Sequence, residues 1–349
     1  MKVFSIVGNR PQFIKAAPTS LALREQGLEE VVLHTGQHYD RELSQVFFDD
    51  LGLDEPRYAL DLRTADPETL QAAIGGPLRQ EEPEWVLVYG DTNSTLAGAL
   101  AAVDAQVPFA HVEAGLRSGD LSMPEERNRI EADRRARRLF CPDERSRDQL
   151  EKEGVPGDAE VVGDVMADAT RLFAPIASER VDVGRLAPER PFHVLTIHRE
   201  GNTEPERLRA LIDALNATEH TFVFPVHPRT RHVFEEHGIE PGPHLHPIAP
   251  IGYLEMLALV AAARAVVTDS GGLQKEAYWL RVPCVTLRPE TEWVDTVLAG
   301  GNTLLDPAEA GRLGEVLDGV SFPADAPELY GDGRAAERIA RSLYTFPPT

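Results

Sequence analysis

Short apolar segments alternate with helical patterns along the whole chain, and this alternation limits the possible folds more than any other feature. The apolar segments form two series, which lie at 2–7, 31–34, 85–89, 108–112 and 139–141 and then at 192–197, 221–225, 265–267 and 283–287. Helical patterns such as 12–25, 41–51 and 94–104 lie between them. Apolar strands joined by helices are typical of buried parallel sheets, so the sequence predicts an α/β protein.

The two series of strands predict two domains. The charged segment 177–190 separates them, and 349 residues is a typical length for a two-domain chain. We expect Rossmann-like domains at 1–172 and 173–333, each built on a doubly wound parallel sheet. By pattern alone, the last helix at 334–344 fits either domain.

Charge and composition exclude several classes of binding partner. The formal net charge of −22 argues against nucleic acid and against a membrane surface as partners, so an anionic ligand would need locally placed cations. Cys141 and Cys284 are too few for a disulfide framework. No apolar run is long enough to span a bilayer, and the sequence begins with a predicted strand instead of a signal peptide. We therefore expect a cytoplasmic protein.

A strand, a Ser-Gly-Gly turn and a helix start follow one another at 265–276. Such a junction binds anions, because first-turn N–H groups and the helix dipole point at the ligand. Gly271 and Gly272 allow a phosphate to approach the backbone, and Ser270 adds a hydroxyl donor. Glu276 follows at a spacing suited to ribose hydroxyls. The simpler alternative is a strand-to-helix turn in which Ser270 only caps the helix.

Charged side chains follow the ends of several predicted strands. Arg10 and Lys15 follow the first strand, Asp91 follows 85–89, Glu113 follows 108–112 and His198 follows 192–197. Parallel sheets bind ligands at the carboxyl ends of their strands. Neighbouring strands are about 4.8 Å apart, so Asp91 and Glu113 are close enough to act on one substrate. Carboxylates beside cations suit the removal and return of a proton.

Each of these residues also has a simpler interpretation. Asp91 could cap a helix that starts near Asn93, and His198 could be a hydrogen-bonded histidine at a strand end. Arg10 could pair with a surface carboxylate. Glu125 directly follows Pro124, where an acidic side chain stabilises a helix start whatever its chemistry.

Taken together, the motifs are specific to one family. They are Gly-Asn-Arg-Pro at 8–11, Gly-Asp-Thr at 90–92, His-Val-Glu-Ala-Gly-Leu-Arg at 111–117, Pro-Glu-Glu at 124–126 with Asn128 and Arg129, and Asp-Ser-Gly-Gly at 269–272 with Glu276. With this set the chain resembles the non-hydrolysing UDP-N-acetylglucosamine 2-epimerases over nearly its whole length. The resemblance implies a GT-B fold, in which two Rossmann-like domains face each other across a cleft. It also implies that the last helix, 334–349, packs back on the first domain, and that the enzyme is a homodimer.

The resemblance further implies an isomerase that interconverts UDP-N-acetylglucosamine and UDP-N-acetylmannosamine. Such enzymes eliminate UDP to leave a 2-acetamidoglucal and then add UDP back, and they require neither a nicotinamide cofactor nor a metal. By motif position, the acid–base carboxylates are Asp91, Glu113 and Glu125, and His198 assists near the diphosphate. The positions that match UDP-binding residues are Arg10, Lys15, Ser270, Gly271 and Gly272, with Glu276 on the ribose.

Several residues depart from the usual family pattern. Asn9 and Gln12 replace Thr and Glu, Lys275 replaces a Glu, Trp293 stands where Arg is commoner, and Glu68-Thr69 replaces a Gln-Thr pair. A modified UDP-N-acetylhexosamine, such as a diacetamido uronate, is therefore an alternative substrate. A GT-B glycosyltransferase and a hydrolysing epimerase are the rival functions. His227 matches a residue that some bacterial members use to bind a second UDP-N-acetylglucosamine as activator.

Overall fold

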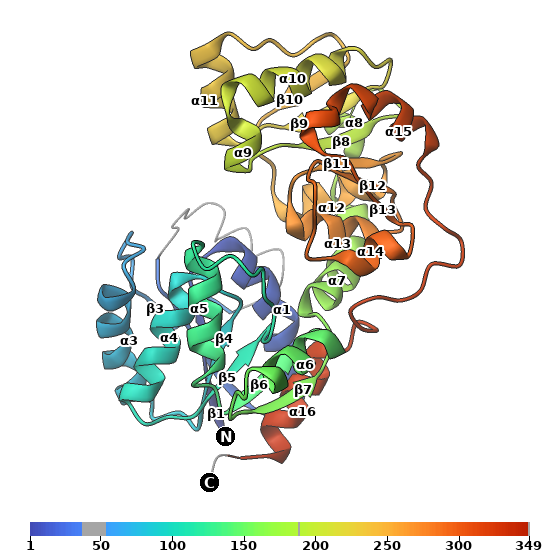
Figure 1. Cartoon of the computed structure of the whole chain (residues 1–349). Coiled ribbons are helices and arrows are strands. Elements are labelled where there is room, and N and C mark those ends of the chain that lie inside the picture. The colour runs from blue at the N-terminus through green and yellow to red at the C-terminus, as the bar shows by residue number, and fades with distance from the viewer. Residues whose placement is uncertain (37–53, 188, 348–349) are drawn as a thin grey trace. The chain divides into compact units, whose positions relative to one another are not determined.

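The computed structural model of the protein describes residues 1–36, 54–187 and 189–347, so the helical pattern expected at 41–51 lies outside the described residues. The chain divides into two compact units (Figure 1): unit 1 combines Met1–Ala169 with Tyr330–Thr349, and unit 2 is Thr170–Leu329. Each unit is built on one parallel sheet, as the alternating pattern predicts. Within the described ranges, no helix is both long and apolar enough to cross a membrane.

Unit 1 contains a seven-stranded sheet with the order β3-β2-β1-β4-β5-β6-β7. Its strands are β1 (Lys2–Val7), β2 (Glu29–His34), β3 (Tyr58–Ala59), β4 (Trp85–Tyr89), β5 (Phe109–Val112), β6 (Arg138–Cys141) and β7 (Asp158–Val161). Every neighbouring pair is parallel. The strand order reverses between β1 and β4, and open parallel sheets of this kind bind ligands at such a reversal.

The helices of unit 1 begin at signals that are present in the sequence. They are α1 (Arg10–Glu25), α3 (Pro67–Glu81), α4 (Asn93–Asp104), α5 (Pro124–Asp133), α6 (Glu144–Lys152) and α16 (Ala335–Thr345), while α7 (Val165–Arg180) crosses the boundary between the units. A proline lies in the first turn of α1, α3 and α5, where its missing N–H costs no helical hydrogen bond. Asn9, Asp66 and Asp143 cap α1, α3 and α6 with their side chains.

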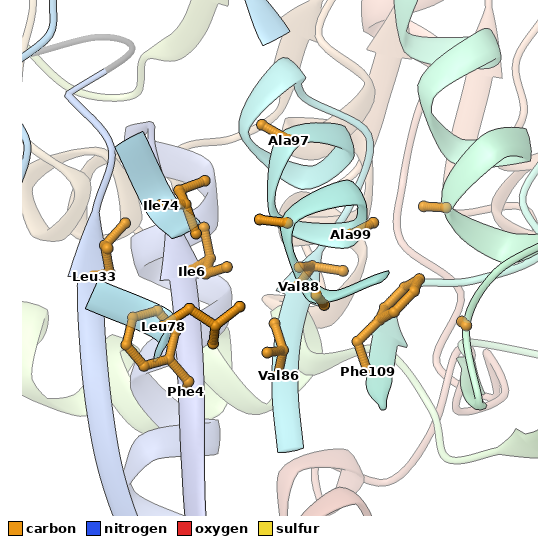
Figure 2. Packing of buried hydrophobic residues seen from close by; sticks show 14 of the residues in the cluster. Phe4, Ile6, Leu33, Ile74, Leu78, Val86, Val88, Ala97, Ala99 and Phe109 are labelled. Atoms are coloured by element: carbon orange, nitrogen blue, oxygen red, sulfur yellow. The ribbon is translucent and has the colours of Figure 1, made fainter. Parts of the chain in front are cut away.

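The core of unit 1 lies between its sheet and its helices (Figure 2). Side chains of β1 and β4 meet those of α3 and α4 there, and the labelled residues include Phe4, Ile6, Val86, Val88, Ile74, Leu78 and Ala97. Gly98 brings α4 close to the sheet, because a Cβ at that position would lie 2.8 Å from Cδ1 of Ile6. This close packing fixes α4, and with it the loop that joins β4 to α4.

The last helix belongs to unit 1, although the whole of unit 2 separates it from the rest of that unit in the sequence. Asp168 accepts hydrogen bonds from the N–H groups of Ala335 (3.1 Å) and Ala336 (2.7 Å), which are the first residues of α16. Arg338 donates to the carbonyl oxygen of Val162 at 3.0 Å. The helix also packs against α1 (Figure 1). Both terminal segments of the chain therefore form part of one unit.

Unit 2 repeats the plan with six strands in the order β10-β9-β8-β11-β12-β13. The strands are β8 (His193–Thr196), β9 (Phe222–Pro225), β10 (Leu245–Ile248), β11 (Val266–Thr268), β12 (Cys284–Thr286) and β13 (Asn302–Leu304). All pairs are parallel. The order reverses between β8 and β11, which places the loops after these two strands at the ligand-binding edge.

Helices pack on both faces of this second sheet, where two clusters of buried apolar residues lie. The helical segments are α8 (Val183–Leu186), α9 (Glu200–Thr203), α10 (Pro205–Asn216), α11 (Pro228–His237), α12 (Tyr253–Ala261), α13 (Gly271–Trp279), α14 (Val294–Leu298), η1 (Pro307–Arg312) and α15 (Leu313–Gly319). The charged segment 177–190 contains the last turn of α7 and the short α8, and the division between the units falls earlier, inside α7.

Candidate functional site

In unit 1, Gln12 connects the loop after β1 to the loop after β4. Its Oε1 accepts from the N–H of Gly8 at 2.8 Å, and its Nε2 donates to the carbonyl oxygen of Tyr89 at 2.7 Å and to Oγ1 of Thr95 at 2.9 Å. The side chain is almost fully buried. Because the two loops flank the reversal in strand order, Gln12 holds the two sides of the candidate site together. Sequence reasoning identified Gln12 only as a departure from the family pattern and missed this role.

Lys15 and Glu113 form a buried ion pair at this edge of the sheet. Nζ of Lys15 lies 2.6 Å from Oε2 of Glu113, and both side chains are nearly nine-tenths buried. Burial alone would lower the pKa of Lys15, but the carboxylates of Glu113 and then Asp91 outweigh it and raise that pKa. Glu113 has a left-handed backbone with φ of 71°, and its N–H donates to the carbonyl oxygen of Phe140 at 3.0 Å. A strained backbone that its surroundings hold in place is common at functional sites.

Asp91 follows β4 and pairs with Arg129 of α5. Burial tends to lower the pKa of Arg129, but the carboxylate of Asp91, with help from Glu126, raises it. Thr92 caps α4, since its Oγ1 accepts from the N–H of Thr95 at 3.3 Å. The interpretation of Asp91 as the helix cap is therefore wrong, and its carboxylate is used in the ion pair.

A buried hydrogen-bond network around Asp133 holds the loops after β4 and β5 in place. The ring of His111 lies between Oδ1 of Asp133 and the carbonyl oxygen of Gly90, at 2.7 Å from each. Nη1 of Arg117 donates to Oδ2 of Asp133 at 2.7 Å. The first and last residues of the motif at 111–117 therefore fix the backbone on which Asp91 and Glu113 stand. Sequence reasoning missed His111, Arg117 and Asp133, although two of them lie inside a motif that it quoted.

The remaining candidates of unit 1 are placed differently. Glu125 is exposed in the first turn of α5, and within the described residues no hydrogen bond or ion pair joins it to Asp91 or Glu113. Its neighbour Glu126 is buried and accepts from the N–H groups of residues 118 and 119. The backbone of Arg10 begins α1, but its side chain lies outside the described part of the chain.

In unit 2, Asp269 holds the end of β11 against the loop after β8. Its fully buried carboxylate accepts from the N–H groups of His198 (3.0 Å) and Arg199 (2.9 Å), and from Nδ2 of Asn202 (3.2 Å). Nδ1 of His198 lies 3.3 Å from Oδ1 of the same carboxylate, and the ring of His198 is over a third exposed. Asp269 was quoted within a motif but was given no role from the sequence.

The helix α13 begins directly after Ser270, at the edge predicted for an anion. Oγ of Ser270 accepts from the N–H of Leu273 at 3.4 Å, so Ser270 does cap the helix. Capping does not exclude anion binding, because several first-turn N–H groups of a helix lack intrahelical partners. At Gly272 a Cβ would meet nothing within 4 Å, which leaves room for a ligand. Glu276 is mostly buried farther along the helix.

Two arginines and a carboxylate lie beside the start of α13. Nη1 of Arg288 lies 2.8 Å from Oε2 of Glu292, and Nη2 of Arg199 lies 3.8 Å from Oε1. A Cβ at Gly271 would be only 2.9 Å from this Oε1, so the carboxylate lies against Gly271. Sequence reasoning missed this cluster because its members come from loops after β8 and β12 that are far apart in the chain.

His227 caps α11 with its ring. Nδ1 accepts from the N–H of Arg229 at 3.2 Å, and the centre of the ring lies 5.7 Å from that of His198. Burial, followed by the nearby His198 and Arg229, lowers the pKa of His227. The structure thus places His227 beside His198 at the same edge of the second sheet.

The comparison with known proteins identifies the family. The profile of the family described as UDP-N-acetylglucosamine 2-epimerase matches residues 21–344. The chain is 44% identical to the UDP-2,3-diacetamido-2,3-dideoxy-D-glucuronate 2-epimerase of Pseudomonas aeruginosa, over 98% of this chain and 99% of that one. It is 35% identical to the UDP-N-acetylglucosamine 2-epimerase of Methanocaldococcus jannaschii, over 98% and 99% of the two chains.

Solved structures agree with the sequence comparison. The crystal structure of the Methanocaldococcus jannaschii UDP-GlcNAc 2-epimerase in complex with UDP-GlcNAc and UDP matches with a TM-score of 0.87 at 35% identity, over 99% of this chain and 100% of that one. Together with the two parallel sheets, this match confirms the predicted GT-B fold. The chain belongs to the UDP-N-acetylglucosamine 2-epimerase family, a family of nucleotide-sugar epimerases.

Proposed function

We propose that this protein inverts the configuration at C2 of a UDP-linked 2-acetamido sugar. The observation that carries the proposal is the pair of carboxylates at the ends of neighbouring strands: Asp91 follows β4, Glu113 follows β5, and each is held by a cation. In a family of 2-epimerases, such a pair provides groups that can remove and return a proton.

The chemistry explains why a UDP-sugar needs such a site. C2 of the sugar is not next to a carbonyl group, so its proton is not acidic enough for simple enolisation. When a base takes this proton, the electrons of the C2–H bond form a C1=C2 double bond and UDP leaves with the electrons of the C1–O bond. UDP then adds back to C1 of the 2-acetamidoglucal while an acid delivers a proton to the opposite face of C2. Atoms and charge balance without another reactant.

The proposed roles follow from the surroundings of each residue. Asp91, Glu113 and Glu125 supply the acid and base, and the cations Lys15 and Arg129 stabilise the ionised carboxylates from which a base can act. Glu125 has the least support, since its side chain is exposed and also suits the start of α5.

Unit 2 is proposed to hold UDP. The start of α13, with Ser270, Gly271 and Gly272, would receive the diphosphate, and Glu276 would bind the ribose. His198, which Asp269 holds at the same edge, would assist near the diphosphate. By the family pattern, Arg10 and Lys15 are also proposed to bind UDP.

Two sugars are candidate substrates. UDP-N-acetylglucosamine, interconverted with UDP-N-acetylmannosamine, is favoured by the family as a whole and by relatives such as the Methanocaldococcus jannaschii enzyme. UDP-2,3-diacetamido-2,3-dideoxy-D-glucuronate is favoured by the 44% identity to the Pseudomonas aeruginosa enzyme. The departures Lys275 and Trp293 lie in contact, with Nζ of the lysine 3.7 Å from the centre of the indole ring.

The family resemblance also supports a homodimer and an activator site at His227 as proposals. Sedimentation at several protein concentrations tests the dimer. A sigmoidal dependence of rate on UDP-N-acetylglucosamine that becomes hyperbolic in His227→Ala would support the activator site, whereas identical curves would refute it.

One experiment tests the reaction and the sugar together. Each candidate is incubated separately in deuterium oxide without acceptor, nicotinamide or added metal, and the products are followed by NMR. We expect C2 inversion of at least one sugar, with deuterium at C2 of both epimers. An epimer that keeps its original C2 hydrogen would exclude the elimination scheme. Conversion that occurs only after an acceptor is added would indicate a glycosyltransferase, and release of free N-acetylmannosamine would indicate a hydrolysing enzyme.

A further inference from the structure

The start of α13 is locally basic although the whole chain carries a formal charge of −22. Arg199 comes from the loop after β8, Arg288 comes from the loop after β12, and Glu292 is the carboxylate between them. Each oxygen of Glu292 faces one guanidinium, at 3.8 Å for Arg199 and 2.8 Å for Arg288. The group therefore resembles two cations that share one small anion.

The shared carboxylate lies where the helix start would receive a ligand. Oε1 of Glu292 would be 2.9 Å from a Cβ at Gly271, and Nη2 of Arg199 would be 3.9 Å from it. Gly271 is the first residue of α13, so the carboxylate lies beside the positive end of the helix dipole. A residue larger than glycine at this position would push the carboxylate of Glu292 aside.

The balance of charge in the cluster favours a stronger anion. Burial, and then the charge of Arg288, lowers the pKa of Arg199, which means that the two guanidinium groups repel each other. Burial alone would raise the pKa of Glu292, but Arg288 and Arg199 lower it, so the carboxylate is ionised. A second carboxylate, Asp269, also acts on Arg199, but its oxygens already accept from the N–H groups of His198 and Arg199 and from Asn202. Glu292 is therefore the carboxylate that faces both guanidinium groups, and the pKa of Arg199 stays lowered in spite of both carboxylates.

We propose that Glu292 occupies the place of a phosphate in the empty protein, and that Arg199 and Arg288 exchange its carboxylate for the diphosphate of UDP when the nucleotide binds. This inference rests on the proposed function of the α13 edge as the UDP site. It adds two binding residues, Arg199 and Arg288, and an internal anion that competes with the ligand.

The exchange is physically feasible. The side chain of Glu292 is one-third exposed, so its carboxylate can move into water after it leaves the arginines. A diphosphate carries more charge and more acceptor oxygens than a carboxylate, and guanidinium groups bind such oxygens well. In the proposed reaction UDP must leave C1 and return to it. The competing carboxylate of Glu292 lowers the affinity of the arginines for UDP, although both cations stay in the site.

The inference is tested by whether removing the charge of Glu292 strengthens or weakens the binding of UDP. Binding of UDP, inorganic pyrophosphate and uridine is measured by calorimetry for the wild type, Glu292→Gln, Arg199→Gln and Arg288→Gln. Glu292→Gln should bind UDP and pyrophosphate about 1.5- to 5-fold more tightly, the range for removing one partly exposed charge contact. Each arginine variant should bind them roughly 10- to 100-fold more weakly, the range for a hydrogen bond to a charged group. Uridine, which has no phosphate, should bind equally to all four proteins.

A matched control separates this local effect from the change in net charge. Glu337→Gln removes a carboxylate that pairs with Arg334 at 2.7 Å at the start of α16 in unit 1, and it should leave UDP affinity unchanged. If Glu292→Gln does not fold, as judged by its thermal transition, Glu292→Ser serves the same purpose, with the same expected gain in affinity.

The possible outcomes distinguish a failure of the carboxylate exchange from a failure of the proposed UDP-binding function. Equal or weaker binding of pyrophosphate by the Glu292 variant, while the wild type binds UDP, would overturn the exchange and leave the UDP site intact. A wild type that binds neither UDP nor pyrophosphate would overturn the proposed function itself. A similar gain for uridine would also refute the exchange, because uridine cannot compete for the arginines.

Discussion

The two units share one sheet plan but carry opposite kinds of chemistry at the point where the strand order reverses. In unit 1, ion pairs of Lys15 with Glu113 and of Arg129 with Asp91 surround the edge, so carboxylates and cations balance. In unit 2, the carboxylate of Asp269 is used by backbone and side-chain N–H groups, and arginines gather at the start of α13. One edge suits the movement of protons and the other suits the binding of an anion.

This difference teaches that the topology determines where a site lies, whereas the loops determine what it does. Both sheets place two loops at the reversal, and in both a buried polar side chain joins these loops. In unit 1 that residue is Gln12, and in unit 2 it is Asp269. A buried residue that joins the two loops is therefore present in both units. The side chains that differ between the units are those proposed to contact the substrate.

The largest expected effect tests the division between chemistry in unit 1 and binding in unit 2. Asp91→Asn and Glu113→Gln should each lose about 10²- to 10⁴-fold in turnover, the range expected for acid–base groups, while UDP affinity in calorimetry changes little. Glu131→Gln serves as the control, since Glu131 of α5 forms a partly exposed pair with Arg135, which lies just after the helix. Near-normal epimerisation by either of the first two variants would contradict the proposed mechanism.

A second prediction tests whether Glu125 transfers a proton, as proposed for Asp91 and Glu113, or only stabilises the start of α5. If its carboxylate moves a proton, Glu125→Gln should lose on the order of 10²-fold in turnover, at the lower end of the same range, and should release detectable 2-acetamidoglucal. Steady-state rates and NMR of the products measure both. A variant with normal turnover would return Glu125 to a structural role at the start of α5, where the helix dipole favours an acidic residue.

Smaller effects are expected in unit 2, and they should appear in binding. Glu276→Ala should weaken UDP roughly 10-fold or more if its carboxylate accepts from ribose hydroxyls, and Ser270→Ala should weaken it less, by about 2- to 10-fold. Turnover at saturating substrate should change little in both variants, whereas Arg10→Ala should reduce affinity and turnover together. Unchanged UDP affinity in Glu276→Ala would disprove the ribose assignment.

The smallest expected effect depends on pH and lies away from both edges. Burial raises the pKa of Asp168 from 3.8 to about 6, although the N–H groups of Ala336 and Ala335 act in the opposite direction. The folded state therefore binds more protons than the unfolded chain between these values. The contribution of this carboxyl to stability is fully present below about pH 4 and is lost as the pH rises through about 6.

The test is hydrogen exchange of the α16 amides in the wild type and in Asp168→Asn between pH 4 and 7. After correction for intrinsic exchange rates, the stability difference between the two proteins should change in that window by no more than about 1.4 kcal/mol per pH unit, the slope for one proton. A difference that does not vary with pH would contradict the raised pKa.

Much of the fold could be predicted because local signals and apolar patterning agree. Proline in the first turn marked the start of α5, and β4 reads as a continuous apolar run that is fully buried in the structure. The predicted boundary at 172/173 and the division at 169/170 both fall inside α7, a continuous helix whose pattern does not change at that point.

The candidate site was predictable only in part. Asp91, Glu113 and Ser270 were found because each lies one or two residues after the end of a strand, where parallel sheets expose their loops. His111 and Asp133 could not be assigned to a pair, since 21 residues separate them in the sequence and neither has a local signal. The same holds for Arg199 and Glu292, which only the sheet order of unit 2 brings together.

The return of α16 to unit 1 has a consequence for synthesis on the ribosome. Residues 170–329 form a contiguous unit, whereas the other unit needs Ala335 and Ala336 to satisfy Asp168. At roughly 5–20 residues per second, translation of this intervening stretch takes on the order of 10 to 30 s, during which the N-terminal sheet waits without its last helix. The nascent chain therefore finishes its contiguous unit first and its split unit last, and a ribosome stalled before residue 335 would display unit 1 without α16 to chaperones.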